Sequence, residues 1–366
     1  MKVICDRGAL VEALNLVGGV VVTRTPKPVL TCVKLSAADG TLTLTATDLE
    51  AAIRVSTARV EITQPGETLV PSDKISQIVR ESNDPTLTIE SSGEETHIRG
   101  QDSHFKMFGY PVGDFPSVPE FSGEADFEIN AGPLAQLIHQ TIYATARENS
   151  RYAINGVLLE REGNKLTVVA TDGHRLALAK GDCKSDKKGT QSAIVPTRAL
   201  QQLLKLLSDA EEIVRVKIAD NQILFATDFA LLTSNLVEGN FPPYKDVIPK
   251  DGDKKATLDT GSLTSAVRRA SLLTNEESKG VKLAFSKTGL KLTSRAPELG
   301  EAEINVDIAG YDGEPVEIGF NPFYLLDALK VVPTEQVQID MKAGNKPGVL
   351  RTGQTFLYVV MPVNLQ

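Results

Sequence analysis

The chain has 366 residues, which is too long for one ordinary hydrophobic core, so we expect two or three domains. Hydrophobic residues make up 41% of the chain, which is enough for such cores and argues against a disordered protein. The formal net charge of −8 argues against a generic nucleic-acid-binding protein, unless the basic residues gather on one face.

The sequence predicts a cytoplasmic protein with no membrane association and no metal site. Charged residues at Lys2 and Asp6 come too early for the apolar region of a secretory signal. No run approaches the roughly 20 apolar residues of a membrane span. The three cysteines (Cys5, Cys32 and Cys183) are widely spaced and fit no metal-ligand pattern, which favours a reducing compartment.

Apolar residues at helical spacing predict a helix at the start of each third of the chain, over 6–17, 131–142 and 261–271. Pro133 suits the first turn of the middle one. The apolar positions that carry the pattern are Leu10, Ala13, Leu14, Val17, Leu134, Leu137, Ile138, Leu263, Ala266, Val267 and Ala270.

Paired β-type runs follow each of these helices. Turn residues separate the two runs of each pair, which is typical of antiparallel hairpins. The paired runs are 33–37 with 42–46, 157–160 with 165–170, and 282–285 with 290–293.

The clearest hairpin signal is Asp172-Gly173, which joins two apolar runs within 168–179. Glycine tolerates the positive φ that such a tight turn needs. The stretch 42–50 repeats the approach to this turn, and 290–295 repeats it more loosely. Thr47, Thr171 and Ser294 lie 124 and 123 residues apart, so the chain reads as one unit used three times.

A second helix is predicted in each third, over 72–80, 197–207 and 321–331, at starting points 125 residues apart. Ser72 and Thr197 are good candidates for N-cap residues. Further strands follow in each third, and they end at Phe115-Pro116 in the first third, Phe241-Pro242 in the second and Met361-Pro362 in the third. We therefore predict an α+β fold of three repeated domains, 1–122, 126–250 and 255–366, each with two helices packed on antiparallel sheets of roughly eight strands.

The six predicted helices contain eight basic and four acidic residues, a net charge of +4, while the rest of the chain carries −12. An acidic protein of this kind could present one positive face to phosphates. Ordinary solvated helix faces would explain the same count. The basic residues are Arg7, Lys74, Arg80, Arg198, Lys205, Arg268, Arg269 and Lys330.

Four blocks, in order along the three repeats, resemble the family of bacterial DNA polymerase III beta subunits, the sliding clamps. They are Arg-Tyr-Ala-Ile-Asn-Gly-Val at 151–157, Thr-Asp-Gly-His-Arg-Leu-Ala at 171–177, Glu-Gly-Asn-Phe-Pro-Pro-Tyr at 238–244 and Tyr-Val-Val-Met-Pro at 358–362. Gly-Asp-Phe-Pro at 113–116 and the overall length also fit. The resemblance implies a head-to-tail homodimer that forms a ring, with helices lining the hole and a continuous sheet outside.

The function implied by the resemblance is physical and not catalytic, and it requires no cofactor. A ring around duplex DNA tethers the replicative polymerase without reading sequence, because phosphate contacts carry no sequence information. The implied partners are that polymerase, the clamp loader, repair polymerases and mismatch-repair proteins, which bind through a short peptide with apolar anchors.

The resemblance also implies a partner-peptide pocket with two subsites. Ala153 departs from the family, where an aromatic residue is common, and so does the tail Val363-Asn364-Leu365-Gln366, so we expect a reshaped second subsite. His174 and Arg175 are expected to orient the peptide. The matching residues are Ile154, Thr171, Gly173, His174, Arg175, Leu176, Pro242, Val247, Val359 and Met361 in the first subsite, and Arg151, Tyr152, Asn321, Tyr324 and Val363 in the second.

Two further surfaces are expected. The DNA-facing residues implied by the resemblance are Arg24, Asn149 and Tyr152, to which charge and helical position add Lys74, Arg80, Arg198, Lys205 and Arg268. The dimer seam is expected to join Lys74, Ile78, Phe105 and Met107 of one subunit to Leu272, Leu273, Glu298, Glu301 and Glu303 of the other.

Two other classes of protein compete with this interpretation. A repeat-built scaffold that never meets DNA would fit the acidic net charge. A hydrolase could use His174 as a base oriented by Asp172, but such close neighbours on a tight turn cannot readily form a relay, and no nucleophile motif accompanies them. His97, His104 and His139 form no metal-spaced cluster, so no metal site is predicted.

Overall fold

The computed structural model describes residues 1–146, 153–274, 280–297 and 299–364. The chain divides into two compact units. Unit 1 comprises Met1–Gly132, Lys184–Lys187 and Arg198–Leu236, and unit 2 comprises Pro133–Cys183, Lys188–Thr197 and Val237–Gln366.

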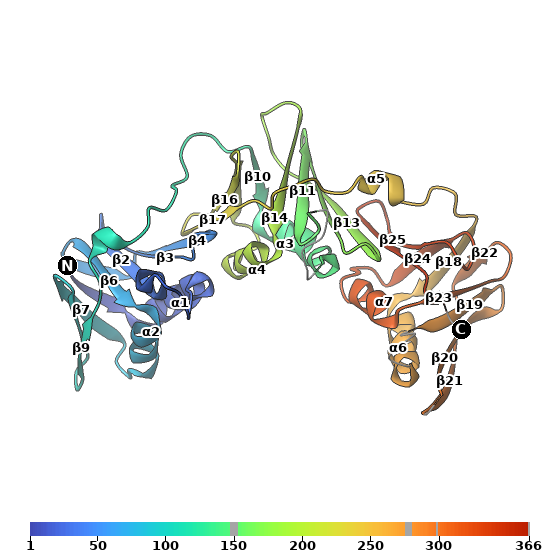
Figure 1. Ribbon diagram of the computed structural model, residues 1–366, viewed down its shortest axis with the longest axis horizontal. Helices are drawn as coiled ribbons and strands as arrows, with labels where there is room; N and C mark the ends of the chain where they lie inside the picture. The colour runs from blue at the N-terminus through green and yellow to red at the C-terminus, as the bar shows by residue number, and fades with distance from the viewer. Residues whose placement is uncertain (147–152, 275–279, 298, 365–366) are drawn as a thin grey trace. The chain divides into compact units, whose positions relative to one another are not determined.

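All six predicted helices are present, and the described residues contain a short seventh α-helix, α5, that was not predicted. The helices are α1 (Arg7–Val17), α2 (Ser72–Glu81), α3 (Ala131–His139), α4 (Thr197–Leu206), α5 (Tyr244–Val247), α6 (Thr260–Ala270) and α7 (Pro322–Leu329). In Figure 1, α1 lies beside α2 in unit 1, and α6 lies beside α7 in unit 2. The apolar stripe of α1 is buried from Leu10 to Val17, as its spacing predicts.

The prediction of Ser72 and Thr197 as N-caps is wrong. Ser72 is the first residue of α2 and makes no capping bond, and Thr197 is the first residue of α4. The Thr197 hydroxyl donates instead to the Asn155 carbonyl oxygen, 3.0 Å away. The side chains of Asp6, Asp259 and Asn321 accept backbone N–H groups and cap α1, α6 and α7.

Unit 1 holds two antiparallel sheets. A five-stranded sheet has the order β5-β1-β7-β8-β9, and an eight-stranded sheet has the order β10-β15-β16-β17-β4-β3-β2-β6. The strands are β1 (Lys2–Asp6), β2 (Cys32–Ala38), β3 (Thr41–Thr47), β4 (Ala51–Thr57), β5 (Val60–Gln64), β6 (Gly66–Pro71), β7 (Thr86–Ser92), β8 (Glu95–Arg99), β9 (His104–Phe108), β10 (Phe127–Asn130), β15 (Ile213–Ile218), β16 (Gln222–Ala226) and β17 (Ala230–Asn235).

Unit 2 also holds two antiparallel sheets. A nine-stranded sheet has the order β14-β11-β12-β13-β26-β25-β24-β18-β22, and a four-stranded sheet has the order β21-β20-β19-β23. The strands are β11 (Gly156–Glu162), β12 (Lys165–Thr171), β13 (Arg175–Asp182), β14 (Thr190–Pro196), β18 (Lys254–Asp259), β19 (Val281–Ser286), β20 (Gly289–Ala296), β21 (Gly300–Val306), β22 (Gly310–Asp312), β23 (Val316–Phe320), β24 (Gln336–Met341), β25 (Gly348–Thr352) and β26 (Phe356–Val360).

The middle repeat gives four strands to each unit, and each set joins a neighbouring repeat edge to edge. In unit 1, β17 pairs with β4, with Thr233 opposite Ala52. In unit 2, β13 pairs with β26, with Leu176 opposite Val359. The two joints are equivalent positions of the repeated unit, and the predicted α+β class with three repeats is confirmed.

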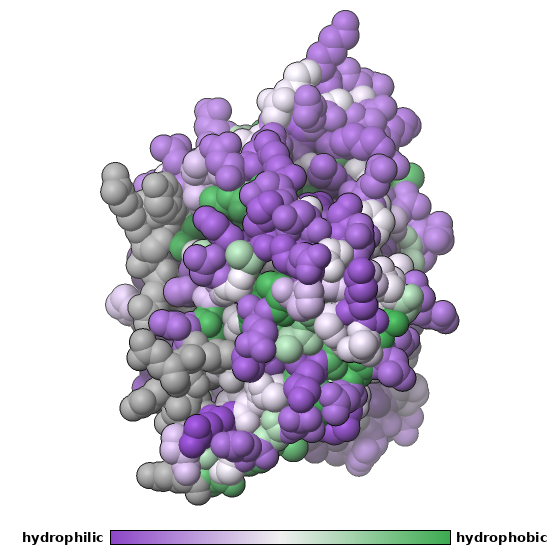
Figure 2. Space-filling model, turned by 90° about the vertical axis from the view of Figure 1, so that its right-hand side faces the viewer, coloured by the Kyte–Doolittle hydropathy of each residue, from purple (hydrophilic) through white to green (hydrophobic). Residues whose placement is uncertain are grey.

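Apolar side chains pack between the sheets and helices of each unit, where they are removed from water. The face drawn in Figure 2 is mostly hydrophilic, and its apolar residues appear in small patches between polar ones.

Candidate functional site

The Asp172-Gly173 turn between β12 and β13 is present as predicted, with φ +89° at Gly173. The Thr171 hydroxyl donates to the Arg175 carbonyl oxygen at 2.6 Å, and it accepts the Gly173 N–H at 3.1 Å. Asp172 Oδ1 accepts the N–H groups of His174 and Arg175 at 2.9 and 3.0 Å. The turn is thus fixed by its own side chains.

Arg175 lies at the centre of the site, and its side chain is only 10% exposed. Its guanidinium donates to Asp172 Oδ2 at 3.0 Å, to Asp327 Oδ2 at 2.8 Å and to the Tyr143 carbonyl oxygen at 2.8 Å. It also stacks on the Tyr324 ring, 4.4 Å from the centroid. Because these contacts occupy the guanidinium within the chain, Arg175 fixes the geometry of the site.

Burial and neighbouring charges shift several pKa values here. Burial alone would lower the pKa of Arg175, but the hydrogen bond to Asp327 and the other neighbouring groups outweigh it and raise that pKa. Burial raises the pKa of the Tyr143 hydroxyl well above its ordinary value. That hydroxyl is buried and has no hydrogen-bond partner among the residues that the structure describes.

An apolar cluster lies beside this turn in unit 2. Leu176 and Val359 are nearly fully buried in it, and they pair across the β13–β26 joint. Val237, Phe241, Ile248 and Leu357 are half-buried and pack against the cluster. The buried members are Ala153, Leu158, Val169, Leu176, Leu178, Ile194, Tyr244, Val349 and Val359.

The segment after β26 is held against the turn by backbone hydrogen bonds. The Met361 N–H donates to the His174 carbonyl oxygen at 2.9 Å, and the Val363 N–H donates to the Gly319 carbonyl oxygen at 2.9 Å. The Met361 side chain is 43% exposed, so an apolar group faces solvent beside the exposed His174.

The helix α5 places two further side chains at the site. The Tyr244 hydroxyl donates to Glu160 Oε1 at 2.9 Å, and Lys245 Nζ donates to the same oxygen at 3.0 Å. Burial, with the Glu160 carboxylate next, raises the pKa of Tyr244 to about 12. Val247, at the end of α5, is 55% exposed.

The structure brings together most of the residues predicted for the pocket. The turn supplies Thr171, Gly173, His174 and Arg175, the β13–β26 joint supplies Leu176 and Val359, and α7 starts at the capping residue Asn321 with Tyr324 in its first turn. Ile154 is buried, whereas Pro242 and Val363 are half-buried. Arg151 and Tyr152 lie outside the described residues.

Sequence reasoning missed Tyr143, Asp327, Tyr244 and Tyr358 as parts of this site. Tyr358 is fully buried, and its hydroxyl donates to the Tyr324 carbonyl oxygen at 2.9 Å. Tyr244 and Tyr358 belong to two of the four family-like blocks, which was the available signal. Asp327 and Tyr143 carry no local signal, because their partner Arg175 is far away along the chain.

The residues predicted to face DNA differ in the contacts that they make within the chain. Arg198 is paired with Asp48 at 2.9 Å, and Lys74 with Asp73 at 3.3 Å. Arg268 is exposed and makes no ion pair within the described part of the chain. Arg80 donates to Asn15, Lys205 donates to Gln202, and Arg24 is exposed, while Asn149 lies outside the described residues.

Some residues expected at the dimer seam lie on two sheet edges: Phe105 and Met107 on β9 in unit 1, and Glu301 and Glu303 on β21 in unit 2. Lys74 and Ile78 lie on α2, and Leu272 and Leu273 lie in the turn that follows α6. Phe105 is 39% exposed and Leu272 is 73% exposed, whereas Met107 is buried. Glu301 and Glu303 are paired within the chain, to Arg295 at 3.2 Å and Lys291 at 3.1 Å. Ile78 and Leu273 are half-buried, and Glu298 lies outside the described residues.

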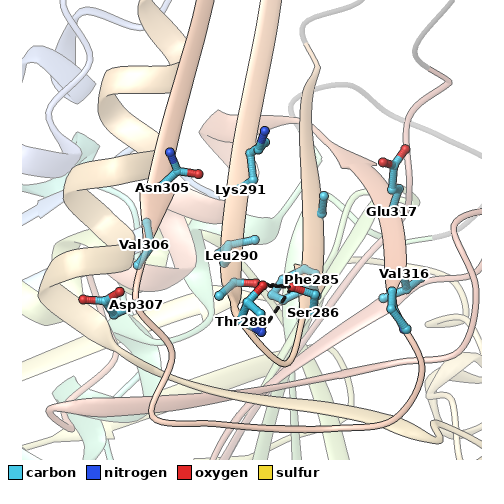
Figure 3. Close-up of a pocket in the computed structure, with 13 residues that line it drawn as sticks. Phe285, Ser286, Thr288, Leu290, Lys291, Asn305, Val306, Asp307, Val316 and Glu317 are labelled. Carbon is cyan, nitrogen blue, oxygen red and sulfur yellow. Dashed lines mark hydrogen bonds between the residues drawn. The ribbon is translucent and has the colours of Figure 1, made fainter.

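Unit 2 also contains an open hollow of about 450 Å³ at the β19–β20 hairpin (Figure 3). Lys291, Asn305 and Glu317 line it from three different strands. Lys291 is paired with Glu303, and Glu317 is paired with Lys282 at 3.2 Å. These charges are therefore already engaged, and we assign the hollow no function.

Catalysis and metal binding find no support in these contacts. Asp172 is bound by backbone N–H groups and by Arg175, so it does not orient His174 as a base. Within the described residues, no group of three or more His, Cys, Asp or Glu side chains could hold a metal ion. His97 and His104 do contact each other, with Nδ1 and Nε2 2.9 Å apart.

Among the helices of the described residues, none is long and apolar enough to span a membrane.

Comparison with known proteins covers almost the whole chain. Three family models match in order: the N-terminal domain of the DNA polymerase III beta subunit at residues 1–119, its central domain at 128–243 and its C-terminal domain at 245–364. The chain is 36% identical to the beta sliding clamp of Pseudomonas putida, over 98% of this chain and 99% of that protein. It is 35% identical to the beta sliding clamp of Escherichia coli K12, over the full length of both.

Comparison with solved structures indicates the same family. The chain is similar to the DnaN sliding clamp of Pseudomonas aeruginosa bound to griselimycin, with a TM-score of 0.95 and 36% identity. It is similar to the DNA polymerase sliding clamp of Bacillus subtilis, with a TM-score of 0.95 and 29% identity. Both alignments cover all of each chain.

Proposed function

The chain belongs to the family of bacterial DNA polymerase III beta subunits, the sliding clamps, and we propose from this that two copies encircle duplex DNA and tether the replicative polymerase. A sliding clamp is a processivity factor and not an enzyme. Tethering raises the effective concentration of the polymerase at the primer end. Phosphate contacts exchange without regard to sequence, which permits sliding.

The observation that carries this proposal is the ordered match of three beta-subunit domains along one chain. We keep the domain boundaries near 122–126 and 250–255 as part of the proposal. The first boundary falls in a segment without a helix or strand, and the second falls at the start of β18, which begins at Lys254.

Ring closure is proposed to join β9 of one copy to β21 of the other. Each strand ends its sheet with an unpaired edge, which can accept another strand. Phe105 and Leu272 offer exposed apolar surface beside these edges. Burial of such apolar surface contributes roughly 25 cal/mol per Å². The Glu301 and Glu303 pairs are exposed, and each contributes only about 0–1 kcal/mol.

The DNA-facing surface is proposed to carry the basic helix residues. Arg268 and Lys205 are good candidates, as are Arg24 and Arg80, because none of the four is held by a carboxylate within the described residues. Arg198 is held by Asp48, so its phosphate contact would compete with that pair. Arg24, Lys74, Arg80, Asn149 and Tyr152 remain in the proposed set.

Partners are proposed to bind at the Asp172–Arg175 turn through an apolar peptide anchor. The exposed side chains of Met361 and Val247 and the half-buried Pro242 would contact the anchor. Arg175 acts by holding the turn against α7, and His174 is exposed and free to meet the peptide. Arg151 and Tyr152 complete the proposed second subsite.

We propose that this peptide site binds several partners in the cytoplasm: the replicative polymerase, the clamp loader, repair polymerases and mismatch-repair proteins.

The test of the proposed function is primer extension on a primed circular template, with the cognate polymerase and clamp loader present. The protein should lengthen the product of a single polymerase binding event. Product length that does not depend on the protein would overturn the proposal.

A further inference from the structure

The first repeat contains a counterpart of the Asp172 turn, built from the same hydrogen bonds. The Thr47 hydroxyl donates to the Ala51 carbonyl oxygen at 2.8 Å and accepts the Leu49 N–H at 3.0 Å. Asp48 Oδ1 accepts the N–H groups of Glu50 and Ala51 at 3.0 and 2.7 Å. This is the pattern of residues 171–175.

Strand β17 of the middle repeat pairs with β4 beside this turn, as β26 of the third repeat pairs with β13, and the same backbone contact is present in both places. The Asn235 N–H donates to the Glu50 carbonyl oxygen at 2.8 Å, as the Met361 N–H does to His174. Thr233 lies opposite Ala52, as Val359 lies opposite Leu176. Unit 1 therefore holds the same backbone frame as the proposed peptide site.

The side chains on this frame are different. Ala52, Thr233 and Asn235 stand where the peptide site has Leu176, Val359 and Met361. A polar and smaller surface replaces an apolar one, so an apolar anchor is not the ligand that fits.

A hollow of about 130 Å³ lies at this frame, entirely within unit 1. Among the described residues that line it, Glu50 is the one with a charged side chain. The neighbouring Asp48 is held by Arg198, so Glu50 sets the charge of the hollow. Gln222 Nε2 donates to Asn235 Oδ1 at 3.1 Å, and Asn235 Nδ2 donates to the Leu49 carbonyl oxygen at 3.4 Å, which fixes the walls.

Thr233 lines the hollow, and its buried hydroxyl is unsatisfied. Its side chain is only 3% exposed, and its hydroxyl oxygen has no hydrogen-bond partner in the described part of the chain. A buried hydroxyl without a partner is unfavourable, so native structures seldom retain one without a use.

Leu49 supplies a second unusual feature at the same place. It has φ +77° at the position that Gly173 occupies in the other turn, and a leucine is strained there. Its side chain is nonetheless 48% exposed and lines the hollow. Strained, exposed residues of this kind concentrate at binding sites.

We propose that this hollow is a second docking site, which takes a lysine or arginine side chain on a peptide of a partner protein. The aliphatic stem would pack on Leu49, Val118 and Pro119, which line the hollow. The cationic head would meet the Glu50 carboxylate and donate to the Thr233 hydroxyl oxygen. The site is independent of the peptide site in unit 2.

The test is a titration of the full-length homodimer, labelled at Thr, Leu and Val methyl groups, followed by methyl NMR. The probes are the blocked tripeptides acetyl-Ala-Lys-Ala-amide and its Arg analogue, with the Gln and Glu analogues as neutral and anionic controls. The cationic peptides should shift the methyl signals of Leu49, Val118 and Thr233. They should bind about fivefold or more tightly than the Gln peptide, because a neutral amide can donate to the Glu50 carboxylate but cannot form an ion pair with it.

Two variants locate the binding. Glu50→Gln should weaken the cationic peptides about fivefold, and the isosteric Thr233→Val should weaken them as well. Glu61→Gln removes an exposed carboxylate on β5 and should change nothing. The inference is overturned if the signals of the three methyl groups do not shift, or if the Gln or Glu peptide binds as tightly as the cationic peptides. It is also overturned if Glu50→Gln leaves the affinity for the cationic peptides unchanged. A Met361→Ser variant should keep this binding, which separates the result from the fate of the peptide site.

Discussion

The Arg175 guanidinium and the Asp327 carboxylate form an ion pair of 2.8 Å that ties the turn after β12 to helix α7. Asp172 and the Tyr143 carbonyl oxygen hold the other sides of the same guanidinium. One largely buried cation thus joins strands of the middle repeat to a helix of the third repeat. The proposed peptide site depends on this junction for its shape.

Arg175→Ala should therefore damage both stability and peptide binding. It leaves the Asp327 and Asp172 carboxylates without their partner, and losing one member of such a pair is strongly destabilising. We expect the midpoint of thermal unfolding to fall by about 4 °C or more. Lys180→Ala, at an exposed position of the same strand, is the matched control and should leave the midpoint unchanged. Equal midpoints for the two variants would show that the ion pair is not a structural anchor.

Stability at high pH should depend on Tyr244. Its pKa is raised to about 12 in the folded protein, first by burial and then by Glu160. The unfolded chain has an ordinary tyrosine pKa near 10, so this contribution is complete below about pH 10 and is lost as the pH rises to about 12. Between pH 9 and pH 11 the wild-type protein should lose more thermal stability than Tyr244→Phe. A variant with the same loss as the wild type would contradict the assigned shift.

Met361→Ser should abolish binding of a partner peptide with apolar anchors and leave the dimer intact. The side chain is exposed beside the turn, so its loss removes contact area without opening the core. Calorimetry with a peptide from the cognate polymerase measures the affinity, and sedimentation measures the dimer. Ile213→Ser, at another exposed apolar residue, is the control. Unchanged affinity in Met361→Ser would show that the site is misplaced.

The double variant Arg268→Glu with Lys205→Glu should weaken DNA retention and flatten its dependence on salt. The slope of log K against log salt should fall by about 0.9 for each phosphate that the variant no longer neutralises. Lys165→Glu reverses a charge on the exposed β12 hairpin and serves as the control. A slope identical to that of the wild type would exclude these two helices from the DNA-facing surface.

Local patterns in the sequence predicted much of this fold. The Asp172-Gly173 turn and the α1 stripe depend on residues within a few positions of each other, so their spacing was sufficient. Ser294 shows the limit of the repeat. Its hydroxyl donates to the Ala270 carbonyl oxygen at 2.7 Å, so the third repeat does not rebuild the turn that follows Thr47 and Thr171.

Long-range contacts were beyond such reasoning. Arg175 and Asp327 are 152 residues apart, and nothing near either residue marks the other. Arg175 matched the family pattern as a peptide-orienting residue, yet its guanidinium is occupied within the chain. The sequence also did not predict which side chains are exposed. Met107 and Phe105 lie on the same strand, but of the two only Phe105 is substantially exposed.

The central claim is that two copies of this chain close around duplex DNA, and retention on DNA of different topology measures it most directly. The protein is loaded onto nicked circular DNA, free protein is removed, and half of the sample is linearised with a restriction enzyme. A ring should stay on the circles and slide off the free ends of the linear DNA within the time of the experiment. Equal retention on both forms would contradict encirclement and indicate ordinary binding to the duplex.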